Sequence, residues 1–405
     1  MSEKNQYFDF ERTEEKAKRK KSFDDLVDEF RKESSGSNNK FDRPKNHRQP
    51  LDYRQKSLIV GLFILVLLFF RATVSSPVKP KTIDFQSTAD GQLLMQIDQR
   101  ISSMATTTRQ ELIPLLDSMK NILSRLSSID KSSSFYISWN KKYIGYLEKY
   151  FNWVEAQKPD LLVDFSSADK NFLPKQNIIL GNFLILFDPA TNILYQADIF
   201  SKDLQKITHS KVISRITKFD EASFLAISQD KKLFLYSLEG RNWKELEVKN
   251  GITGNPQDFF IYSDRLYVLS DNLYRYDKTD RGFATAKSWL SEKINLEKIT
   301  KMASDGSIYL SAQTDILKFN RGKQVNFQME KISPAINGIK AFFTSEDTDY
   351  ILVLADHQIV IFDKKGNLLK QISSPLWQTP QAISIMNGQN KIFVVDGQKI
   401  WKISF

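Results

Sequence analysis

Short apolar strands separated by turn residues fill the chain from about residue 161 to its end, and one strand recurs at a nearly constant interval. This strand is "NLYRY" (272–276) or a variant of it. The first apolar residues of its six copies are Ile193, Leu233, Leu273, Ile316, Ile359 and Ile400. Successive copies are therefore 40, 40, 43, 43 and 41 residues apart. A period of this length is typical of the blades of a β-propeller.

Another strand precedes each copy across a tight turn, as "RLYVLS" (265–270) and "KIFVVD" (391–396) illustrate. In the last copy Asp396 and Gly397 form a dipeptide that two-residue hairpin turns prefer. Prolines stand just before the first strands of three units, where a missing amide donor is tolerated, at Pro256, Pro334 and Pro380. The pattern predicts up to four antiparallel strands per unit, and hence an all-β six-bladed β-propeller over 160–405.

The last unit, 380–405, shows only three strands. We expect "LLVDF" (161–165) to supply the fourth, so that the two ends of the domain close the ring. The alternative is an open β-meander, which would leave exposed sheet edges of the kind that natural sheets avoid.

Three segments carry a resemblance to a known family: "DRLYVLSDNLYRYDKTDRGF" (264–283), "SDGSIYLSAQTDILKFNRGK" (304–323) and "IVIFDKKGNLLKQI" (359–372). They resemble the NHL/WD-like propeller ectodomain of membrane proteins from candidate-phyla bacteria, which is sometimes fused through a transmembrane helix to a PPM-type protein phosphatase. The resemblance covers about 160–405 and implies a propeller ectodomain. The segment 1–56 is too short for the phosphatase domain and lacks its metal-binding aspartate motifs, so no phosphatase activity is implied.

An uncharged apolar run, "SLIVGLFILVLLFF" (57–70), continues through Arg71 to residue 74. Its 18 residues are near the lower limit for crossing a hydrocarbon core about 30 Å thick. The run is apolar all round, which a half-buried helix would not be. We therefore expect a transmembrane signal anchor over 57–74, with Lys56 and Arg71 at the two membrane interfaces and the Arg71 guanidinium reaching back to the headgroups.

Basic residues set the expected orientation of this span. Five Lys and Arg residues lie within 42–56, whereas only two lie between Arg71 and Gly91. Because positively charged flanks stay in the cytoplasm, we expect a single-pass plasma-membrane protein with a cytoplasmic N-terminus and an extracytoplasmic propeller. A cleaved signal peptide is the alternative, which the 56-residue leader disfavours.

The tail, 1–56, is polar and highly charged, and most of it is expected to be disordered. Within it, Ser22 and Asp25 resemble a capping box. Four apolar residues follow on one helical face, Phe23, Leu26, Val27 and Phe30. This segment is either a short helix that binds a cytoplasmic partner or a chance amphipathic pattern.

A linker (75–90) leads to a predicted helical stalk over 91–159. Apolar residues recur there in steps of three and four, at Leu94, Ile97, Ile101, Met104, Leu112, Leu115, Met119, Ile122, Leu126 and Ile129. The rhythm slips near Thr108, and Pro114 lacks an amide donor, so a kink or a break is expected there. An aromatic stripe follows, Tyr136, Trp139, Tyr143, Tyr146, Tyr150 and Trp153. The stalk is either a parallel coiled coil that makes a homo-oligomer or an intramolecular helical hairpin against the propeller.

Charge and rare residues limit the chemistry. The 58 basic residues face 48 acidic ones along the whole chain, which favours a mixed solvated surface over a nucleic-acid groove. The chain has no cysteine and only His47, His209 and His357. The aspartates at 271, 277 and 280 do not have the spacing of a calcium loop. We therefore expect neither a cofactor nor a bound metal.

These observations favour a non-enzymatic, membrane-anchored propeller that acts as a binding, scaffold or sensor module for an extracytoplasmic protein or glycan. The alternative is an extracytoplasmic hydrolase, lyase or quinoprotein, because propellers host many unrelated activities. Loops that enter the first strands contain Trp289 and Trp377. We expect these tryptophans either to anchor a partner or to pack between neighbouring blades.

Overall fold

The computed structural model describes residues 85–104, 108–386 and 388–405. All of them belong to one compact unit. The predicted span with Lys56 and Arg71, and the tail face made by Phe23, Leu26, Val27 and Phe30, lie outside the described residues. Among the residues that are described, no helix is long and apolar enough to cross a membrane.

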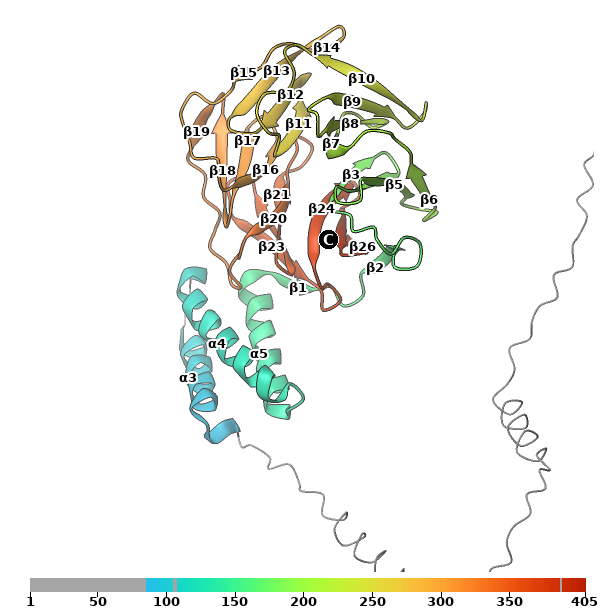
Figure 1. Ribbon diagram of the computed structural model, residues 1–405. Helices are drawn as coiled ribbons and strands as arrows, with labels where there is room; N and C mark the ends of the chain where they lie inside the picture. Colours follow the sequence, from blue (N-terminus) through green and yellow to red (C-terminus); the bar gives the residue numbers. More distant parts are fainter. Residues whose placement is uncertain (1–84, 105–107, 387) are drawn as a thin grey trace, which may run out of the picture. The chain divides into compact units, whose positions relative to one another are not determined.

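Antiparallel β-sheets make up most of the described chain (Figure 1). The first sheet contains β3 (Gln176–Leu180), β4 (Phe183–Asp188), β5 (Ile193–Asp198) and β6 (Leu204–Ile207). The second begins with β7 (Ile213–Lys218), β8 (Ser223–Ser228), β9 (Leu233–Ser237) and β10 (Asn242–Val248). It continues with β11 (Asp258–Tyr262), β12 (Arg265–Leu269), β13 (Leu273–Thr279), β14 (Gly282–Phe283) and β15 (Lys287–Ser288).

Three further sheets complete the β-structure. One contains β16 (Ile299–Ser304), β17 (Ile308–Ala312), β18 (Asp315–Asn320) and β19 (Lys323–Val325). The next contains β20 (Ile339–Phe343), β21 (Tyr350–Ala355), β22 (Gln358–Asp363) and β23 (Leu368–Ser373), with β1 (Trp153–Glu155) added in parallel to β23. The last contains β24 (Pro380–Met386), β25 (Lys391–Asp396), β26 (Lys399–Ser404) and β2 (Asp160–Asp164).

The second sheet is two antiparallel units joined edge to edge. Strand β14 pairs antiparallel with β13 and parallel with β10, which connects β7–β10 to β11–β13. Gly282 permits this junction, because a Cβ atom there would lie 2.1 Å from the carbonyl oxygen of Glu247. The junction therefore depends on a residue without a side chain.

Neighbouring units contact each other through their first strands. Strand β3 contacts β7, β7 contacts β11, β11 contacts β16, β16 contacts β20, β20 contacts β24, and β24 contacts β3 again. The Asn177 side-chain amide on β3 donates a hydrogen bond of 2.8 Å to the Ser384 hydroxyl on β24, across the last of these contacts. These closed contacts give the all-β domain a propeller-like architecture, and the repeated apolar residues of the sequence start or nearly start the third strand of each unit.

The predicted closure of the ring is confirmed. Strand β2 pairs antiparallel with β26, with Asp160 opposite Lys402 and Asp164 opposite Lys399. Leu162 and Val163 of β2 are both buried where β2 pairs with β26. The turn between β25 and β26 differs in one detail from the predicted Asp396–Gly397 dipeptide. Asp396 pairs with Lys399, so the two turn residues are those that follow Asp396.

In the described part of the chain, three helices and a short 3-10 turn precede the sheets. They are η1 (Phe85–Ser87), α3 (Ala89–Ser103), α4 (Arg109–Asp130) and α5 (Ser134–Phe151). The Thr88 hydroxyl accepts the Gly91 amide at the start of α3, and the Thr108 amide donates to Glu111 at the start of α4. The predicted break lies between α3 and α4, whereas Pro114 is accommodated inside α4.

The predicted coiled-coil seam is buried within the same chain. Its central residues, with Leu116 in place of Leu115, form one core with α5 and the sheets, and they are Leu94, Ile97, Ile101, Leu112, Leu116, Met119, Ile122 and Leu126. Ile129 remains 59% exposed. The parallel coiled coil does not describe this arrangement, because most of the seam is already buried against other segments of the same chain. The helices fold back on themselves and on the ring.

The aromatic stripe forms only part of the α5 packing face. The buried residues are Trp139, Tyr143, Leu147 and Phe151. The helix ends at Asn152, which adopts a left-handed conformation with a φ of 52°, so Trp153 lies on β1 and not on the helix. The chain thus passes directly from the bundle to the outer edge of the sheet that contains β20–β23.

Candidate interaction surface

Trp377 does not serve as an exposed anchor. It is only 4% exposed and packs in a core that includes Ile383 and Trp401. Trp289 is half-buried, its ring meets that of Tyr267 edge-on at 6.0 Å, and its amide donates to the carbonyl of Leu273. Trp377 therefore packs within the sheets, whereas Trp289 packs along one side and keeps part of its surface exposed.

The described histidines and the aspartate Asp277 that were considered as metal ligands lie in separate parts of the molecule. His209 lies beside Trp243 with a ring-centroid distance of 5.7 Å, and His357 is exposed in the turn between β21 and β22, while His47 lies outside the described residues. Asp277 pairs with Lys287, Arg275 and Arg265, and the hydrogen bond from Lys287 is the main cause that lowers its pKa. Within the described part of the chain, no group of three or more metal-ligating side chains occurs.

A polar cluster fastens neighbouring sheets to each other. The Lys364 ammonium donates to Asp305 at 2.6 Å, to the Thr344 hydroxyl and to the carbonyl of Ser345. The Tyr309 hydroxyl donates to the same Asp305 carboxylate at 3.0 Å. Burial, together with Asp305, raises the pKa of Tyr309. Because Lys364 uses all three of its donors, this cluster is a structural link between the sheets of β16–β19 and β20–β23.

The most exposed large aromatic side chain of the described residues is Phe200, which is 59% exposed. It lies in the turn between β5 and β6. The Asp198 carboxylate accepts the amides of Phe200 and Ser201, each at 2.8 Å, and Lys202 completes the turn with a φ of 66°. The hydrogen bond from Ser201, followed by that from Phe200, holds the pKa of Asp198 below its ordinary value. The turn is thus fixed while the ring of Phe200 points to solvent.

Two contacts connect the turn of Phe200 to the last sheet. The Lys391 ammonium lies 5.8 Å from the centroid of the Phe200 ring, and the Lys202 ammonium donates to the carbonyl of Leu161 on β2 at 3.0 Å. Leu161 itself is 38% exposed. We call Leu161, Phe200, Lys202 and Lys391 the Phe200 surface. It joins the first sheet to the last one, where the ring closes.

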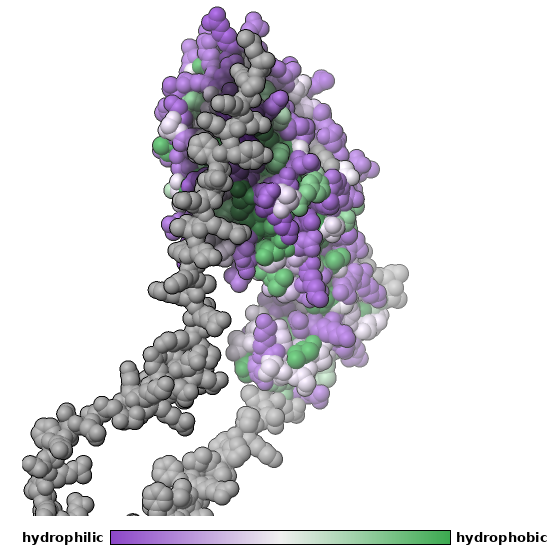
Figure 2. Space-filling view, turned by 90° about the vertical axis from the view of Figure 1, so that its right-hand side faces the viewer, coloured by the Kyte–Doolittle hydropathy of each residue, from purple (hydrophilic) through white to green (hydrophobic). Residues whose placement is uncertain are grey.

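In the part of the chain that the structure describes, Phe200 is one of several exposed large apolar side chains, and it is the aromatic one among them. On the side drawn in Figure 2, purple side chains predominate and hydrophobic ones form smaller green patches among them. An exposed aromatic ring with the Lys391 ammonium beside it combines apolar contact area with charge, which is typical of residues that anchor protein interfaces.

Sequence reasoning missed Phe200 because it follows β5 directly and resembles the last apolar residue of that strand. The segment "DIFSKD" (198–203) did contain a signal. Aspartate and serine are common in tight turns, and both occur here, on either side of Phe200. The central side chains of a turn lie outside the sheet.

The fold and this surface define a β-propeller-like protein with an exposed phenylalanine near the seam of its ring. No protein-family model matches the sequence, and a search of curated proteins gives no match. Among solved structures, the chain is similar to the β-propeller domain of Cps50 (Swd1) from Myceliophteria thermophila, at 12% sequence identity and a TM-score of 0.44. The similarity covers 57% of this chain and 97% of that domain.

Proposed function

We propose that this chain is a single-pass membrane protein whose propeller binds an extracytoplasmic protein. When the second sheet is counted as two blades, the ring has six blades. The observation that carries the binding role is the Phe200 ring, which is exposed on a turn that Asp198 holds rigid. Preorganised aromatic side chains concentrate binding free energy, because little conformational entropy is lost when they are covered.

The helical bundle supports a role as a scaffold. Its core is continuous with the core between β16–β19 and β20–β23, so the bundle and the ring behave as one body. The apolar run at 57–74 precedes this bundle in the sequence. A ring fixed to a membrane-proximal base would present the Phe200 surface in a constant orientation to its partner.

Capture of partners from envelope extracts tests the binding role. The full-length chain and its Phe200→Ala variant are compared with Leu376→Ala, the control, since Leu376 is 45% exposed on the connection from β23 to β24. Phe200 lies in the turn between the third and fourth strands of its unit, whereas Leu376 lies on a connection from a fourth strand to the next unit. These two kinds of loop lie at opposite ends of an antiparallel unit, so Leu376 is not on the same end of the ring as Phe200. We expect Phe200→Ala to lower recovery of the partner at least tenfold and Leu376→Ala to leave it unchanged. Equal recovery by all three proteins contradicts the role of Phe200, and turnover of a glycan or ester by the purified chain contradicts a non-enzymatic function.

The membrane topology has its own test. The chain has no cysteine, so Ser35→Cys and Asp347→Cys are single reporters, and Asp347 is exposed between β20 and β21. An impermeant maleimide added to intact cells should label only the Asp347→Cys protein, and lysed cells should show labelling of both. Labelling of the Ser35→Cys protein alone on intact cells reverses the orientation, and labelling of neither places the ring inside.

A further inference from the structure

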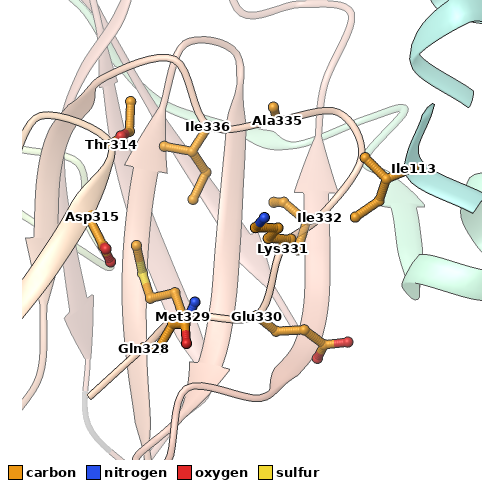
Figure 3. Close-up of a pocket in the computed structure, with 10 residues that line it drawn as sticks. All are labelled: Ile113, Thr314, Asp315, Gln328, Met329, Glu330, Lys331, Ile332, Ala335 and Ile336. Carbon is orange, nitrogen blue, oxygen red and sulfur yellow. The ribbon is translucent and has the colours of Figure 1, made fainter. Parts of the chain in front are cut away.

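A hollow of about 290 Å³ lies where α4 meets the ring, away from the Phe200 surface. Ten residues line it, from α4, from the start of β18 and from the segment between β19 and β20. They are Ile113, Thr314, Asp315, Gln328, Met329, Glu330, Lys331, Ile332, Ala335 and Ile336 (Figure 3). A hollow of this volume holds a molecule of amino-acid size and is near the lower limit for small-ligand sites.

The floor of the hollow is apolar. Met329 and Ile332 are buried, and Ile113 and Ile336 are half-buried beside them. Ile113 reaches the hollow from α4, whereas the other three belong to the segment that crosses from one sheet to the next. A ligand with a branched or long apolar side chain would therefore contact both the bundle and the ring.

Opposite charges stand at the rim of the hollow without ionic partners among the described residues. The Asp315 carboxylate accepts only the amide of Ile316, at 2.8 Å, and the Lys331 ammonium makes no hydrogen bond or ion pair with any described residue. Glu330 differs, because its carboxylate is held by Arg109. In Figure 3 Asp315 and the Glu330 carboxylate lie on opposite sides of the view, and Lys331 lies between them beside Ile332.

From this arrangement we propose that the hollow binds a small zwitterion of the apolar amino-acid class. Its ammonium group pairs with Asp315, its carboxylate pairs with Lys331, and its side chain covers the floor between Ile113 and Ile332. Each charged group of the ligand then has a partner of opposite sign, and the apolar part leaves water. Because the ligand touches α4 and the ring together, its binding stabilises the junction between them.

Calorimetric titration of the purified full-length chain tests this site with three probes. L-leucine carries both charges, N-acetyl-leucine lacks the ammonium, and leucinamide lacks the carboxylate. We expect L-leucine to bind at millimolar or lower concentration and each analogue to bind at least tenfold more weakly, as charge-assisted hydrogen bonds imply. L-isoleucine, L-methionine and L-phenylalanine extend the series if the floor prefers another shape.

Variants of the chain link the effect to the two rim residues. Asp315→Asn should abolish the preference for L-leucine over N-acetyl-leucine, and Lys331→Gln should abolish the preference for L-leucine over leucinamide. Lys323→Gln, an exposed lysine on β19 that does not line the hollow, should change neither. The proposal is overturned if none of the four amino acids binds at about 10 mM, the weakest affinity of interest. It is also overturned if an amino acid binds and both rim variants leave its binding unchanged. Neither result bears on partner capture by the Phe200 surface.

Discussion

Arg109 at the start of α4 and Glu330 on the segment between β19 and β20 form an ion pair of 3.0 Å that connects the helical bundle to the ring. Both residues make a second contact, because the Arg109 Nε donates to the carbonyl of Tyr150 at 2.7 Å and Glu330 accepts the amide of Leu368 at 2.8 Å. The pair therefore joins α4, α5 and two segments of the ring at a single point.

Removal of Arg109 should weaken the junction between bundle and ring. Arg109→Ala leaves the half-buried Glu330 carboxylate without its cation, so we expect a loss of about 1–3 kcal/mol in the free energy of unfolding. The control is Arg125→Ala, which breaks the more exposed pair with Asp90 between α3 and α4 and should have a clearly smaller effect, because solvent screens exposed ion pairs. Denaturant titration of the full-length variants measures both. Equal losses would mean that the Arg109 pair contributes no more than a surface pair.

The closing strand offers two adjacent leucines with opposite exposure. Leu162 is 4% exposed and Leu161 is 38% exposed. Leu162→Ala should lower the free energy of unfolding by about 2–5 kcal/mol, since it opens a cavity where β2 pairs with β26. Leu161→Ala should change it by less than about 0.5 kcal/mol. A small effect of Leu162→Ala in thermal unfolding would show that the seam contributes little to the stability of the ring.

Acid should weaken the contact between α3 and α5. Burial raises the pKa of Asp98, but hydrogen bonds from Lys142 and Tyr146, at 2.8 and 2.6 Å, outweigh it and leave the pKa below its ordinary value of 3.8. The Asp98 carboxylate therefore contributes its full stabilisation of the folded state above its unfolded-state pKa. This contribution disappears as the pH falls through the lower, folded-state pKa. Asp98→Asn should lower the melting temperature at pH 7.

The difference in melting temperature between the wild type and Asp98→Asn should then shrink as the pH falls below about 4. Glu148→Gln serves as the control, because Glu148 is exposed on α5 and makes no ion pair with the described residues. A difference that stays constant between pH 7 and pH 3 would mean that Asp98 acts through packing and not through its charge.

The Asp198 turn can be loosened without removing Phe200. Asp198→Ala deletes both hydrogen bonds from the Asp198 carboxylate to the amides of Phe200 and Ser201, so the phenylalanine should sample several orientations. We expect partner recovery to fall by a smaller factor than in Phe200→Ala, with an unchanged melting temperature. Recovery equal to that of the wild type would mean that the exposed ring suffices and its fixed position does not matter.

The sequence predicts the sheets well and the packing of the helices less well. The apolar residues that begin at Ile193 recur because each third strand is buried on the same face, and a repeated environment leaves a repeated pattern. The heptad seam carries no such information about its partner, since a leucine is equally apolar against a second chain or the same one. The seam also names single residues less well, because the buried face of α4 is wider than the seam: Leu116 and Leu123 are buried in addition to Met119, while Leu115 is only half-buried.

The candidate site was hidden for a different reason. Trp377 lies in a loop near proline, a position that suits both interface anchoring and packing between sheets, and only the fold shows that it is 4% exposed. Phe200 resembles the end of a strand until Asp198 is seen to accept the amides of the turn. The hollow between α4 and the ring depends on residues from segments that are distant in the sequence, such as Ile113 and Ile332.

The pairing of β2 with β26 also governs the order in which the molecule can fold. Strand β2 precedes its partner β26 by most of the ring's sequence, and the contact between Gln398 and Asp169 at this seam joins residues 229 positions apart. Contacts of such large sequence separation form slowly, because the intervening chain loses entropy when its ends meet. Until residues 399–404 are made, β2 lacks the strand with which it pairs, so the ring cannot close before β26 is in place.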